Sequence, residues 1–343
     1  MNNNRRNRYF KQILLQEIGE QGQDLLNKST ALIAGCGALG SVIANTLVRT
    51  GVGHIKIIDR DFIELDNLPR QVLFDEEDIR KGLPKAIAAY EKLKYINSEI
   101  RIEPIVGDLT PENIERLIKD VDIILDGTDN FETRFLINNA CIKHNIPWIY
   151  GGVVSTLGMS ATIIPGETPC FQCLVSEMPQ PGTLPTCDTV GVLGTVVNII
   201  ASIECTEAIK ILTDQKESLL RKLIYIDPWN GRWNFYDFKD VNSHCTVCND
   251  KNFIYLEKRK GSHATSLCGQ NSVQISVFSK EPVQFPNIAK RLEAIGDVSY
   301  NDYMLKLKID SYEFVLFRDN RTIIKGTSDI SLAKNLFSKY IGL

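Results

Sequence analysis

Two Cys-x-x-Cys pairs, far apart in the sequence, constrain what this chain can fold into more than any other feature. They are Cys170–Cys173 and Cys245–Cys248. Two such pairs together are typical of a structural Zn²⁺ site, because four thiolates complete the tetrahedral coordination of the metal. The alternative is two unrelated turns with buried cysteines. We expect a zinc clamp that pins the C-terminal end of the core onto the middle of the fold, with His244 as a bystander.

Size and charge narrow the class of protein. The chain has 343 residues, 43% of them apolar, enough for one large domain or for one large and one small domain. Its net charge is -3, which argues against nucleic acid as a partner. No stretch approaches the roughly 20 apolar residues that span a bilayer, and the polar N-terminus lacks the apolar segment of a signal peptide. We expect a cytoplasmic globular protein with no membrane partner, whose paired cysteines bind metal rather than form disulfides.

A glycine-rich turn follows an apolar run at residues 30–34. The glycines of this turn are Gly35, Gly37 and Gly40. Helical spacing follows over residues 41–49, and a β-branched run follows over residues 54–59. This order lets backbone N–H groups and a helix N-terminus face a phosphate, and it places Asp59 to accept hydrogen bonds from ribose hydroxyls. The motif alone fits NAD as well as any other nucleotide, and glycines that serve only close packing are the alternative.

The next part of the chain alternates between helical and strand patterns. Helices are expected over residues 85–94, 110–119 and 131–144, and strands over residues 100–106, 121–125 and 146–150. We expect Thr110 to be the N-cap of the helix that contains Pro111. Later strands are expected over residues 160–164, 222–226 and 234–238, around a helix at residues 196–212. The pattern predicts an α/β fold, a Rossmann-like doubly wound, mainly parallel sheet extended by antiparallel strands.

Composition shifts near residue 252, where a second domain is expected to begin. Strand patterns cover residues 273–277, 303–309, 313–317 and 322–325, and helical patterns cover residues 287–294 and 331–340. We expect residues 1–253 to form the main domain with the four-cysteine zinc site. Residues 254–343 are expected to form a small α+β domain, for which the sequence indicates no role.

Several charged and amide residues after the glycine turn are unlike those of a dehydrogenase. They are Asp61, Asn67, Arg70, Gln71, Lys85, Asp129 and Asn130. A guanidinium and an ammonium directed at one nucleotide suit a triphosphate, and an aspartate at the carboxyl end of a strand suits Mg²⁺. Taken singly, Arg70 also fits a surface ion pair, and Lys85 fits a cation at the start of a helix.

Together these motifs resemble the family of ThiF, MoeB and HesA, which includes the adenylation domains of ubiquitin-activating enzymes. The matching segments are residues 8–12, the glycine turn, residues 59–61, 67–71, 84–85 and 128–130 with Arg134, both cysteine pairs, and residues 187–189. They follow the family order across about residues 8 to 250. Residues 130–135 and the C-terminal extension resemble most closely the ThiF members from Gram-positive bacteria.

The resemblance implies an adenylyltransferase that uses ATP to activate the C-terminal glycine of a ubiquitin-like sulfur-carrier protein ending in Gly-Gly. The carrier it implies is ThiS-like, and the step would lead to a thiocarboxylate for the thiazole of thiamine. It implies that Asp59 holds the ribose, that Arg70 and Lys85 hold the phosphates, and that Asp129 binds Mg²⁺. Residues carried over to the nucleotide site are Gly35, Gly37, Gly40, Asp59, Asp61, Asn67, Arg70, Gln71, Lys85, Asp129 and Asn130.

Two further catalytic residues, Lys11 and Cys187, follow from the resemblance. The family commonly has arginine at position 11, where it reaches the phosphates of the neighbouring subunit, so a homodimer is implied; lysine keeps the charge and loses the planar fork. Either Arg6 or Arg8 is an alternative for this role. Cys187 lies in a proline-rich segment, residues 178–188, that we expect to be a flexible loop, and family members use this position for a thioester or an acyl-disulfide. A persulfide donor such as a cysteine desulfurase is the partner this implies. By contrast, we expect Cys36, Cys141 and Cys205 to be buried.

Three other functions fit part of the sequence. A MoaD-like carrier of molybdopterin synthesis would suit the same chemistry. An NAD-dependent oxidoreductase would suit the glycine turn, but the chain offers no plausible catalytic dyad for hydride transfer. A zinc-ribbon nucleic-acid binder would suit the cysteines, but the chain lacks a basic, aromatic strip.

Overall fold

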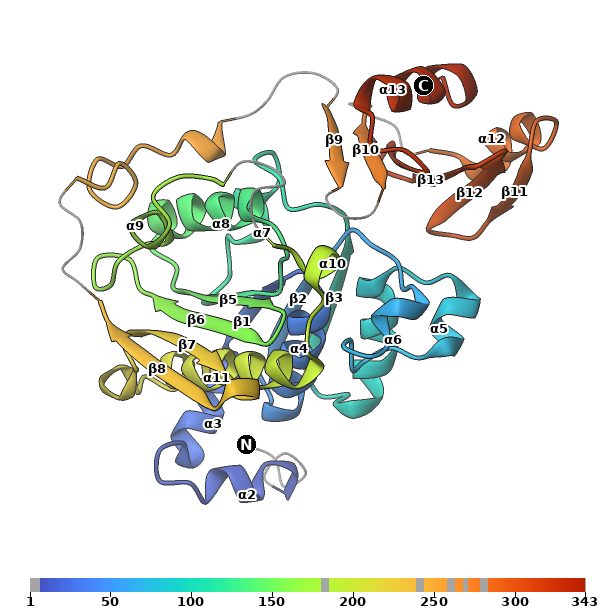
Figure 1. The fold of residues 1–343 in the computed structure, drawn as a ribbon. Helices are drawn as coiled ribbons and strands as arrows, with labels where there is room; N and C mark the ends of the chain where they lie inside the picture. Colours follow the sequence, from blue (N-terminus) through green and yellow to red (C-terminus); the bar gives the residue numbers. More distant parts are fainter. Residues whose placement is uncertain are drawn as a thin grey trace. The chain divides into compact units, whose positions relative to one another are not determined.

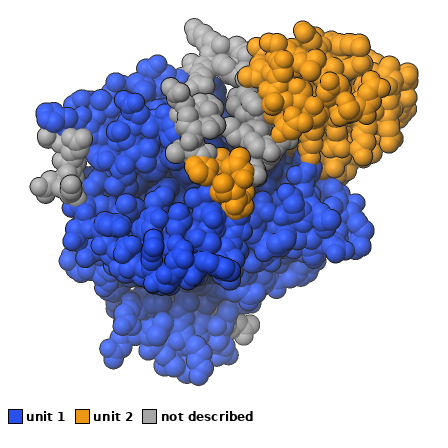
Figure 2. Space-filling view, in the orientation of Figure 1, with its two compact units in different colours: residues 1–179, 192–258 blue, residues 180–191, 259–343 orange. Residues whose placement is uncertain are grey.

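The computed structural model shows two compact units (Figure 1). It describes residues 7–179, 185–238, 244–257, 263–267, 271–277 and 283–342. One unit comprises residues 1–179 and 192–258, and the other comprises residues 180–191 and 259–343; Figure 2 colours them separately. Arg5, Arg6 and Cys268 lie outside the described residues.

The first unit is built on an eight-stranded sheet. In spatial order its strands are β3 (Arg101–Val106), β2 (His54–Asp59), β1 (Thr30–Ala34), β4 (Ile123–Asp126), β5 (Trp148–Val154), β6 (Leu157–Ile163), β7 (Lys222–Asp227) and β8 (Arg232–Asp237). Strands β3 to β5 are parallel, and β5 to β8 pair antiparallel. The predicted doubly wound sheet with an antiparallel extension is therefore confirmed.

Helices cover both faces of this sheet, and alternate side chains of each strand serve the two faces. In β1, Ala31 and Ile33 pack into one core while Leu32 and Ala34 pack into the other. The first core contains α4 (Ala38–Thr50), α6 (Lys85–Ile96) and α11 (Gly194–Leu212). The second contains α7 (Ile114–Leu117) and α8 (Phe131–His144). Burial on both faces explains why the parallel strands read as continuous apolar runs.

Strand order reverses direction at β1, and this positions the site. From β1 the chain moves outward to β2 and β3, and then returns to place β4 on the other side of β1. Connections on either side of β1 therefore leave the carboxyl ends of β1 and β4 in opposite directions. In open parallel sheets, ligands bind at this switch point.

Helix α8 anchors the two segments that carry the paired cysteines. Asn138 Oδ1 accepts a hydrogen bond from Phe171 N (2.9 Å), and Asn139 Oδ1 accepts one from Tyr255 N (3.2 Å). The rings of Phe135 and Phe171 pack edge to face at 5.3 Å. The short helices here are α9 (Phe171–Leu174) and η4 (Ile254–Leu256). Neighbouring residues of one helix thus hold segments that are far apart in sequence.

The remaining helices of the first unit are short or lie at its N-terminus. They are α2 (Phe10–Ile13), α3 (Gly19–Lys28), η1 (Leu65–Asn67), α5 (Glu76–Lys81), η2 (Lys216–Ser218) and η3 (Pro228–Asn230). Tyr9 fixes the N-terminal segment, because its buried ring leaves no room for a side chain at Gly51 and its hydroxyl accepts a hydrogen bond from Asn97 Nδ2 at 2.7 Å. Among the described residues, no helix has the length and apolar character needed to cross a membrane.

The second unit is a six-stranded antiparallel sheet with two helices. In spatial order its strands are β11 (Asp297–Tyr300), β12 (Met304–Ile309), β13 (Tyr312–Phe317), β14 (Arg321–Lys325), β10 (Ser272–Ser276) and β9 (His263–Leu267). Helices α12 (Phe285–Leu292) and α13 (Ile330–Tyr340) pack with one face of the sheet around Phe314 and Leu316. Four of these strands and both helices match the predicted patterns, whereas β9 and β11 were not predicted.

One local prediction was wrong, and one short helix was not predicted. Thr110 does not cap a long helix, because its carbonyl and amide are engaged with Asn113 in a turn and α7 begins only at Ile114. Cys187, near the end of the expected flexible loop, begins the unpredicted short helix α10 (Cys187–Val190), whose first turn is capped by Thr186. Residues 180–184 of the expected loop lie outside the described residues.

Candidate functional site

The glycine turn, residues 35–40, joins β1 to α4. Gly35 has φ of +90° and donates its N–H to Ile58 O on the adjacent strand at 2.8 Å. A Cβ at Gly40 would overlap the carbonyl oxygen of Gly35. The N-cap of α4 is Gly37, which supplies no side-chain cap. The first N–H groups of α4 are therefore available to an anion.

A second turn, residues 126–130, follows β4 and packs directly on the glycine turn. We call it the acidic turn. A Cβ at Gly127 would overlap Gly35 O, and a Cβ at Gly35 would lie 2.5 Å from Gly127 O. Backbone therefore meets backbone where β1 and β4 end, and neither position has room for a side chain. This contact places the acidic turn beside the N-terminus of α4.

Asp59 lies at the end of β2 and is bound to the glycine turn. Its Oδ2 accepts a hydrogen bond from Cys36 N at 2.6 Å, and its Oδ1 accepts one from Asp61 N at 2.7 Å. Burial raises the pKa of Asp59 to about 6, against the opposing charge of Lys85. Each carboxylate oxygen keeps a second lone pair, so Asp59 can still accept hydrogen bonds from hydroxyl groups.

Asp61 and Lys85 form an ion pair beside Asp59. Lys85 Nζ lies 3.3 Å from Asp61 Oδ2, and Lys85 N donates to Asp61 O at 2.9 Å. The ammonium is buried at the first residue of α6. Burial alone would lower the pKa of Lys85, but the charges of Asp61, Asp59 and Asp129 outweigh it and raise the pKa. Lys85 is therefore a positive charge held among carboxylates.

Arg60 belongs to the same charged group, although the sequence predicted no role for it. Its Nη1 lies 3.1 Å from Asp108 Oδ1, and its Nε lies 3.6 Å from Asp61 Oδ1. Burial opposes its charge, yet Asp108, Asp61 and Asp129 raise the pKa of Arg60. The available signal was an arginine between two aspartates after β2, together with an aspartate just after the neighbouring strand β3.

In the segment around η1, the side chains of Asn67 and Arg70 form hydrogen bonds within the segment itself. Asn67 Oδ1 accepts a hydrogen bond from Glu64 N at 3.3 Å, and Arg70 Nη1 donates to Asp66 O at 2.6 Å. Gln71 is buried, and its Nε2 lies 4.0 Å from the position of a Cβ at Gly37. Within the described part of the chain, its Oε1 has no hydrogen-bond partner. Gln71 is therefore brought to the glycine turn, whereas Asn67 shapes its own turn.

Arg134, which reaches back from α8, holds the acidic turn. Arg134 Nε donates to Asp126 Oδ2 at 2.8 Å, and its Nη2 donates to Thr128 O (2.8 Å) and to Gly151 O on β5 (2.9 Å). Asp126 Oδ1 in turn accepts from Thr128 N and Oγ1, at 2.9 and 2.6 Å. We call the Asp126–Arg134 ion pair, with its hydrogen bonds to Thr128 and Gly151, the bracket. It fixes the backbone immediately before Asp129.

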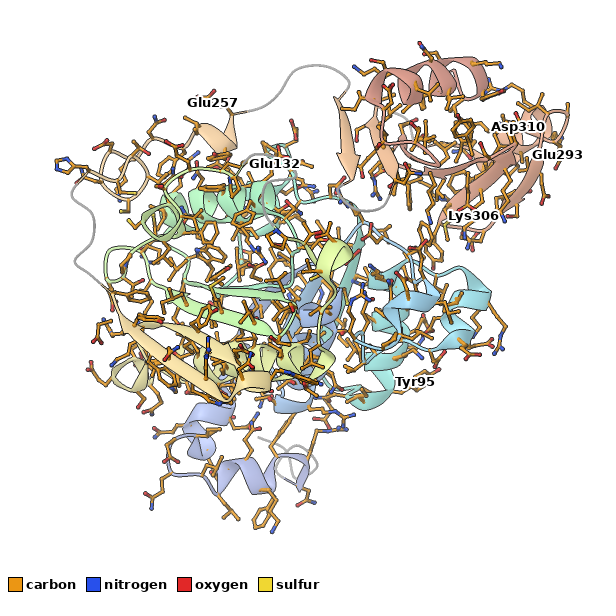
Figure 3. All side chains as sticks on the ribbon, in the orientation of Figure 1. Tyr95, Glu132, Glu257, Glu293, Lys306 and Asp310 are labelled. Carbon is orange, nitrogen blue, oxygen red and sulfur yellow. The ribbon has the colours of Figure 1, made fainter. Side chains whose placement is uncertain are left out.

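Asp129 itself is exposed, whereas the amide of Asn130 is used by α8. Asn130 Oδ1 accepts from Thr133 N at 2.9 Å as the N-cap of the helix, and its Nδ2 lies 3.3 Å from Asp129 Oδ1. Figure 3 draws the side chains on the ribbon, with Glu132 of the first helical turn labelled. The Asp129 carboxylate also contributes to the raised pKa values of Lys85, Arg60 and Arg134.

Lys11 and Cys187 belong to two short helices at other points of the chain. Lys11 is exposed on α2, where its Nζ lies 5.7 Å from the centre of the Phe10 ring. Cys187 is partly exposed at the start of α10. The structure buries Cys36, Cys141 and Cys205 as expected, and burial raises the pKa of each thiol.

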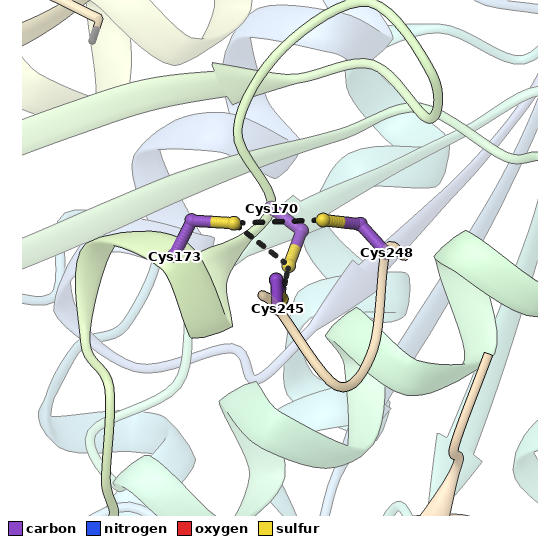
Figure 4. Close-up of side chains that lie close together, drawn as sticks. All are labelled: Cys170, Cys173, Cys245 and Cys248. Atoms are coloured by element: carbon purple, nitrogen blue, oxygen red, sulfur yellow. Dashed lines mark hydrogen bonds between the residues drawn. The ribbon is translucent and has the colours of Figure 1, made fainter. Parts of the chain in front are cut away.

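The four paired cysteines come together in one cluster (Figure 4). Their sulfur atoms all lie within 4.8 Å of one another. The Sγ–Sγ distances are 3.8 Å for Cys170–Cys173, 3.6 Å for Cys170–Cys245 and 3.5 Å for Cys173–Cys248. Four ligands at the Zn–S distance of about 2.3 Å would stand about 3.8 Å apart in a tetrahedron. The donor set and its spacing therefore fit Zn²⁺, and His244 is not part of the cluster.

Comparison with known proteins points to one family. A sequence profile described as the ThiF family matches residues 9–247. The chain is 41% identical over 338 residues to the sulfur carrier protein ThiS adenylyltransferase of Bacillus subtilis, an alignment that covers 98% of this chain and 99% of the relative. It is 32% identical over 249 residues to the sulfur carrier protein adenylyltransferase of Thermus thermophilus, covering 71% and 91%. A crystal structure of E. coli MccB with ATP superimposes with a TM-score of 0.61 and 27% identity, covering 72% of this chain and 75% of that one.

If the four cysteines bind Zn²⁺, a substitution that removes the metal should also lower the stability of the protein. Pure protein should contain about one Zn²⁺ per chain, and Cys245→Ser should reduce this content and lower the melting temperature by more than about 10 °C. Binding of structural zinc contributes about 10–16 kcal/mol of folding free energy in small peptides. This is comparable to the free energy of unfolding of a whole domain. Elemental analysis and calorimetry measure both quantities. Cys141→Ala, which removes a buried thiol outside the cluster, is the control and should keep its metal. A metal-free wild type as stable as the metal-loaded protein would contradict the assignment.

Proposed function

This chain belongs to the ThiF family, and from that premise we propose that it uses ATP to adenylate the C-terminal glycine of a ubiquitin-like sulfur-carrier protein. The observation that carries the proposal is the match over nearly the whole length with a relative named for the adenylation of ThiS. The carrier we propose is accordingly ThiS-like and ends in Gly-Gly, and the product serves as a step toward its thiocarboxylate in thiazole synthesis. Pyrophosphate exchange measured with ThiS-like and MoaD-like carriers discriminates between the two pathways.

In the proposed reaction, a carboxylate oxygen of the carrier attacks the α-phosphorus of ATP. A new P–O bond forms, the bond to the β-phosphate oxygen breaks, and pyrophosphate leaves with that electron pair. The chain's own task is to position the reactants and to offset charge. In this proposal Asp59 accepts hydrogen bonds from the ribose, Arg70 and Lys85 face the phosphates, and the N-terminus of α4 with Gln71 lies beside the reacting phosphorus.

Asp129 is the residue we propose to hold Mg²⁺. Its carboxylate is exposed on a turn whose backbone is fixed on both sides, and oxygen ligands from one or two carboxylates and from phosphates are what this ion prefers. When bound, Mg²⁺ would offset negative charge on the triphosphate. Zn²⁺ at the four cysteines would have no part in the reaction and would hold the cysteine segments together.

Loss of the Asp129 carboxylate should stop catalysis without unfolding the protein. Asp129→Ala should lower the rate of ATP–pyrophosphate exchange by at least about 100-fold, because triphosphate charge would then be poorly offset. The melting temperature should stay within about 2 °C, since the side chain is exposed. Asp120→Ala, an exposed aspartate before the other end of β4, is the matched control. Exchange near the wild-type rate under saturating Mg²⁺ would remove Asp129 from the site.

We further propose a homodimer in which Lys11 of one subunit serves the nucleotide site of the other. Apolar side chains next to Lys11 are exposed to solvent in the single chain, with relative exposures of 49% for Phe10, 60% for Leu14 and 52% for Leu15. A surface of this kind, rimmed by charged residues, is typical of a protein contact. Arg8 is engaged elsewhere, because its Nη1 donates to Ile96 O at 3.0 Å, and this favours Lys11 over Arg8 for the role.

Mixed dimers test this arrangement. Asp129→Ala and Lys11→Ala homodimers should each be inactive, while exchange of subunits between them should restore about one quarter of the wild-type activity, because half of the dimers would be mixed and each would have one intact site. Sedimentation checks that the dimers form and exchange. Absence of any restoration in exchanged mixtures would show that Lys11 does not act across the interface.

Cys187 is proposed to act after adenylation, in transfer of sulfur from a persulfide donor such as a cysteine desulfurase. Its thiol is partly exposed. Val192, five residues further along, bridges to Ser155 just after β5, so at most about 18 Å of chain separates Cys187 from that strand end. We propose the reducing cytoplasm as the location, where thiols such as that of Cys187 stay reduced.

Substitution of Cys187 should separate the two half-reactions. Cys187→Ala should keep ATP–pyrophosphate exchange within about twofold of wild type, because no ribose, phosphate or metal contact is proposed for it. The covalent conjugate with the carrier, sought by mass spectrometry with and without reductant, should disappear. Cys141→Ala again serves as the control thiol. Thiocarboxylate formation at the wild-type rate by Cys187→Ala would show that the donor's sulfur reaches the acyl-adenylate directly.

A further inference from the structure

Glu204 of α11 is a buried carboxyl group to which no role has been assigned. Its side chain has no exposed surface, and neither carboxyl oxygen has a partner at full hydrogen-bonding geometry among the described residues, although the backbone amide of Asp126 is near enough to favour its ionised form. It lies against β5, because a Cβ at Gly151 would overlap Glu204 Oε1. Buried carboxylates are normally hydrogen-bonded or paired, so this group requires an explanation.

Glu207, one turn later on the same helix, shows the usual solution. Its carboxyl oxygens accept hydrogen bonds from Thr162 Oγ1 at 3.0 Å and from Leu220 N at 3.1 Å, and they pair with Lys210 Nζ at 2.6 Å. The two glutamates are almost equally buried, at 0% and 3% relative exposure. Burial alone therefore does not distinguish them; the difference lies in the partners.

The groups around Glu204 belong to the bracket that holds the acidic turn. Asp126 of β4 and Arg134 of α8 act on its charge, while Tyr150 of β5 and Cys205 of α11 are in turn affected by it. Gly151, on which Glu204 lies, offers its carbonyl to Arg134 Nη2 at 2.9 Å. Glu204 therefore contacts Gly151, whose carbonyl accepts the hydrogen bond from Arg134 that links the acidic turn to β5.

Charge balance favours a neutral Glu204. Asp126 and Arg134 are paired at 2.8 Å and form a neutral unit. An ionised Glu204 would add a second negative charge, without solvent, beside that pair. Burial holds the pKa of Glu204 well above its usual range and the charge of Asp126 raises it further, while Arg134 and the backbone amide of Asp126 oppose the shift.

We propose that Glu204 is a positioning residue whose neutral carboxyl group fills the space over Gly151 and leaves Arg134 bound to Asp126. In this state the bracket keeps the acidic turn, and Asp129 on it, packed on the glycine turn. Ionised Glu204 competes with Asp126 for Arg134 and loosens the turn. The effect on catalysis rests on the proposed function; the effect on the turn does not.

The direction with pH follows from the raised pKa. A neutral Glu204 contributes to stability fully below the pKa of an unfolded glutamate, about 4.3. That contribution is lost as pH rises through the higher pKa of the folded state. The acidic turn should therefore loosen as pH rises through this folded-state pKa, whereas a residue that cannot ionise at this position should prevent the loosening.

Glu204→Gln, which has the same shape and no charge, tests the proposal together with Glu207→Gln. Hydrogen exchange of the peptide covering residues 123–134 is measured from about pH 6 to about pH 9.5 and corrected for the intrinsic rate. At the alkaline end the wild type should exchange at least about threefold faster than Glu204→Gln, and at the acid end the two should agree. Glu207→Gln should behave like the wild type in this peptide but lose stability, because it breaks an ion pair. Should Glu204→Gln misfold, Glu204→Met replaces it.

The rate of ATP–pyrophosphate exchange over the same pH range, with each profile normalised to its value near pH 7, supplies the second readout. The alkaline decline of the wild type should be reduced at least about threefold in Glu204→Gln and unchanged in Glu207→Gln. An alkaline response of the turn that is identical in wild type and Glu204→Gln would overturn the proposal. If the wild type shows no exchange with any carrier, the proposed function fails, while hydrogen exchange still decides the role of Glu204.

Discussion

The contact between Gly35 and Gly127 is the constraint on which the rest of the site depends. It lets two turns from adjacent strands, β1 and β4, meet backbone to backbone. One turn supplies the N-terminus of α4, and the other supplies Asp129. A methyl group at Gly35 or Gly127 would overlap the backbone of the opposite turn and push the two turns apart. The N-terminus of α4 and Asp129 would then be separated. The fold brings these turns together only because strand order reverses at β1.

The elements of this site could be predicted from the sequence, whereas the roles of the side chains that hold them could not. Apolar runs and glycines predicted β1, β2 and the glycine turn, because local patterning determines them. No role was predicted for Arg60, Arg134 or Glu204, since their partners come from other elements and no spacing in the sequence reports such contacts. Asp108 pairs with Arg60 only because β2 and β3 are neighbours. Thr110 was misread because a threonine before proline also suits a turn.

The four-cysteine cluster shows the opposite case. The four cysteines could be predicted as a set, because the spacing of thiolates within each pair is a local signal. The contacts that hold the two cysteine segments in place could not be predicted. Asn138 and Asn139 of α8 each accept a backbone N–H from one of the two cysteine segments. Consecutive residues of a helix point about 100° apart, so one helix can face two segments at once. The clamp and the site therefore share α8: its first turn holds the acidic turn through Arg134, and its middle holds the cysteine segments.

The cationic groups of the site are already paired with carboxylates, so an anionic ligand would compete with those carboxylates. Lys85 is already paired with Asp61, and Arg60 is paired with Asp61 and Asp108. In the proposed reaction, an incoming triphosphate competes with Asp61 for the N–H donors of Lys85 and approaches the carboxylates that surround this ammonium. A divalent cation bound with the phosphates would offset that repulsion. The proposed function therefore suits a polyanion that arrives with its metal, because the buried ammonium of Lys85 already faces carboxylates.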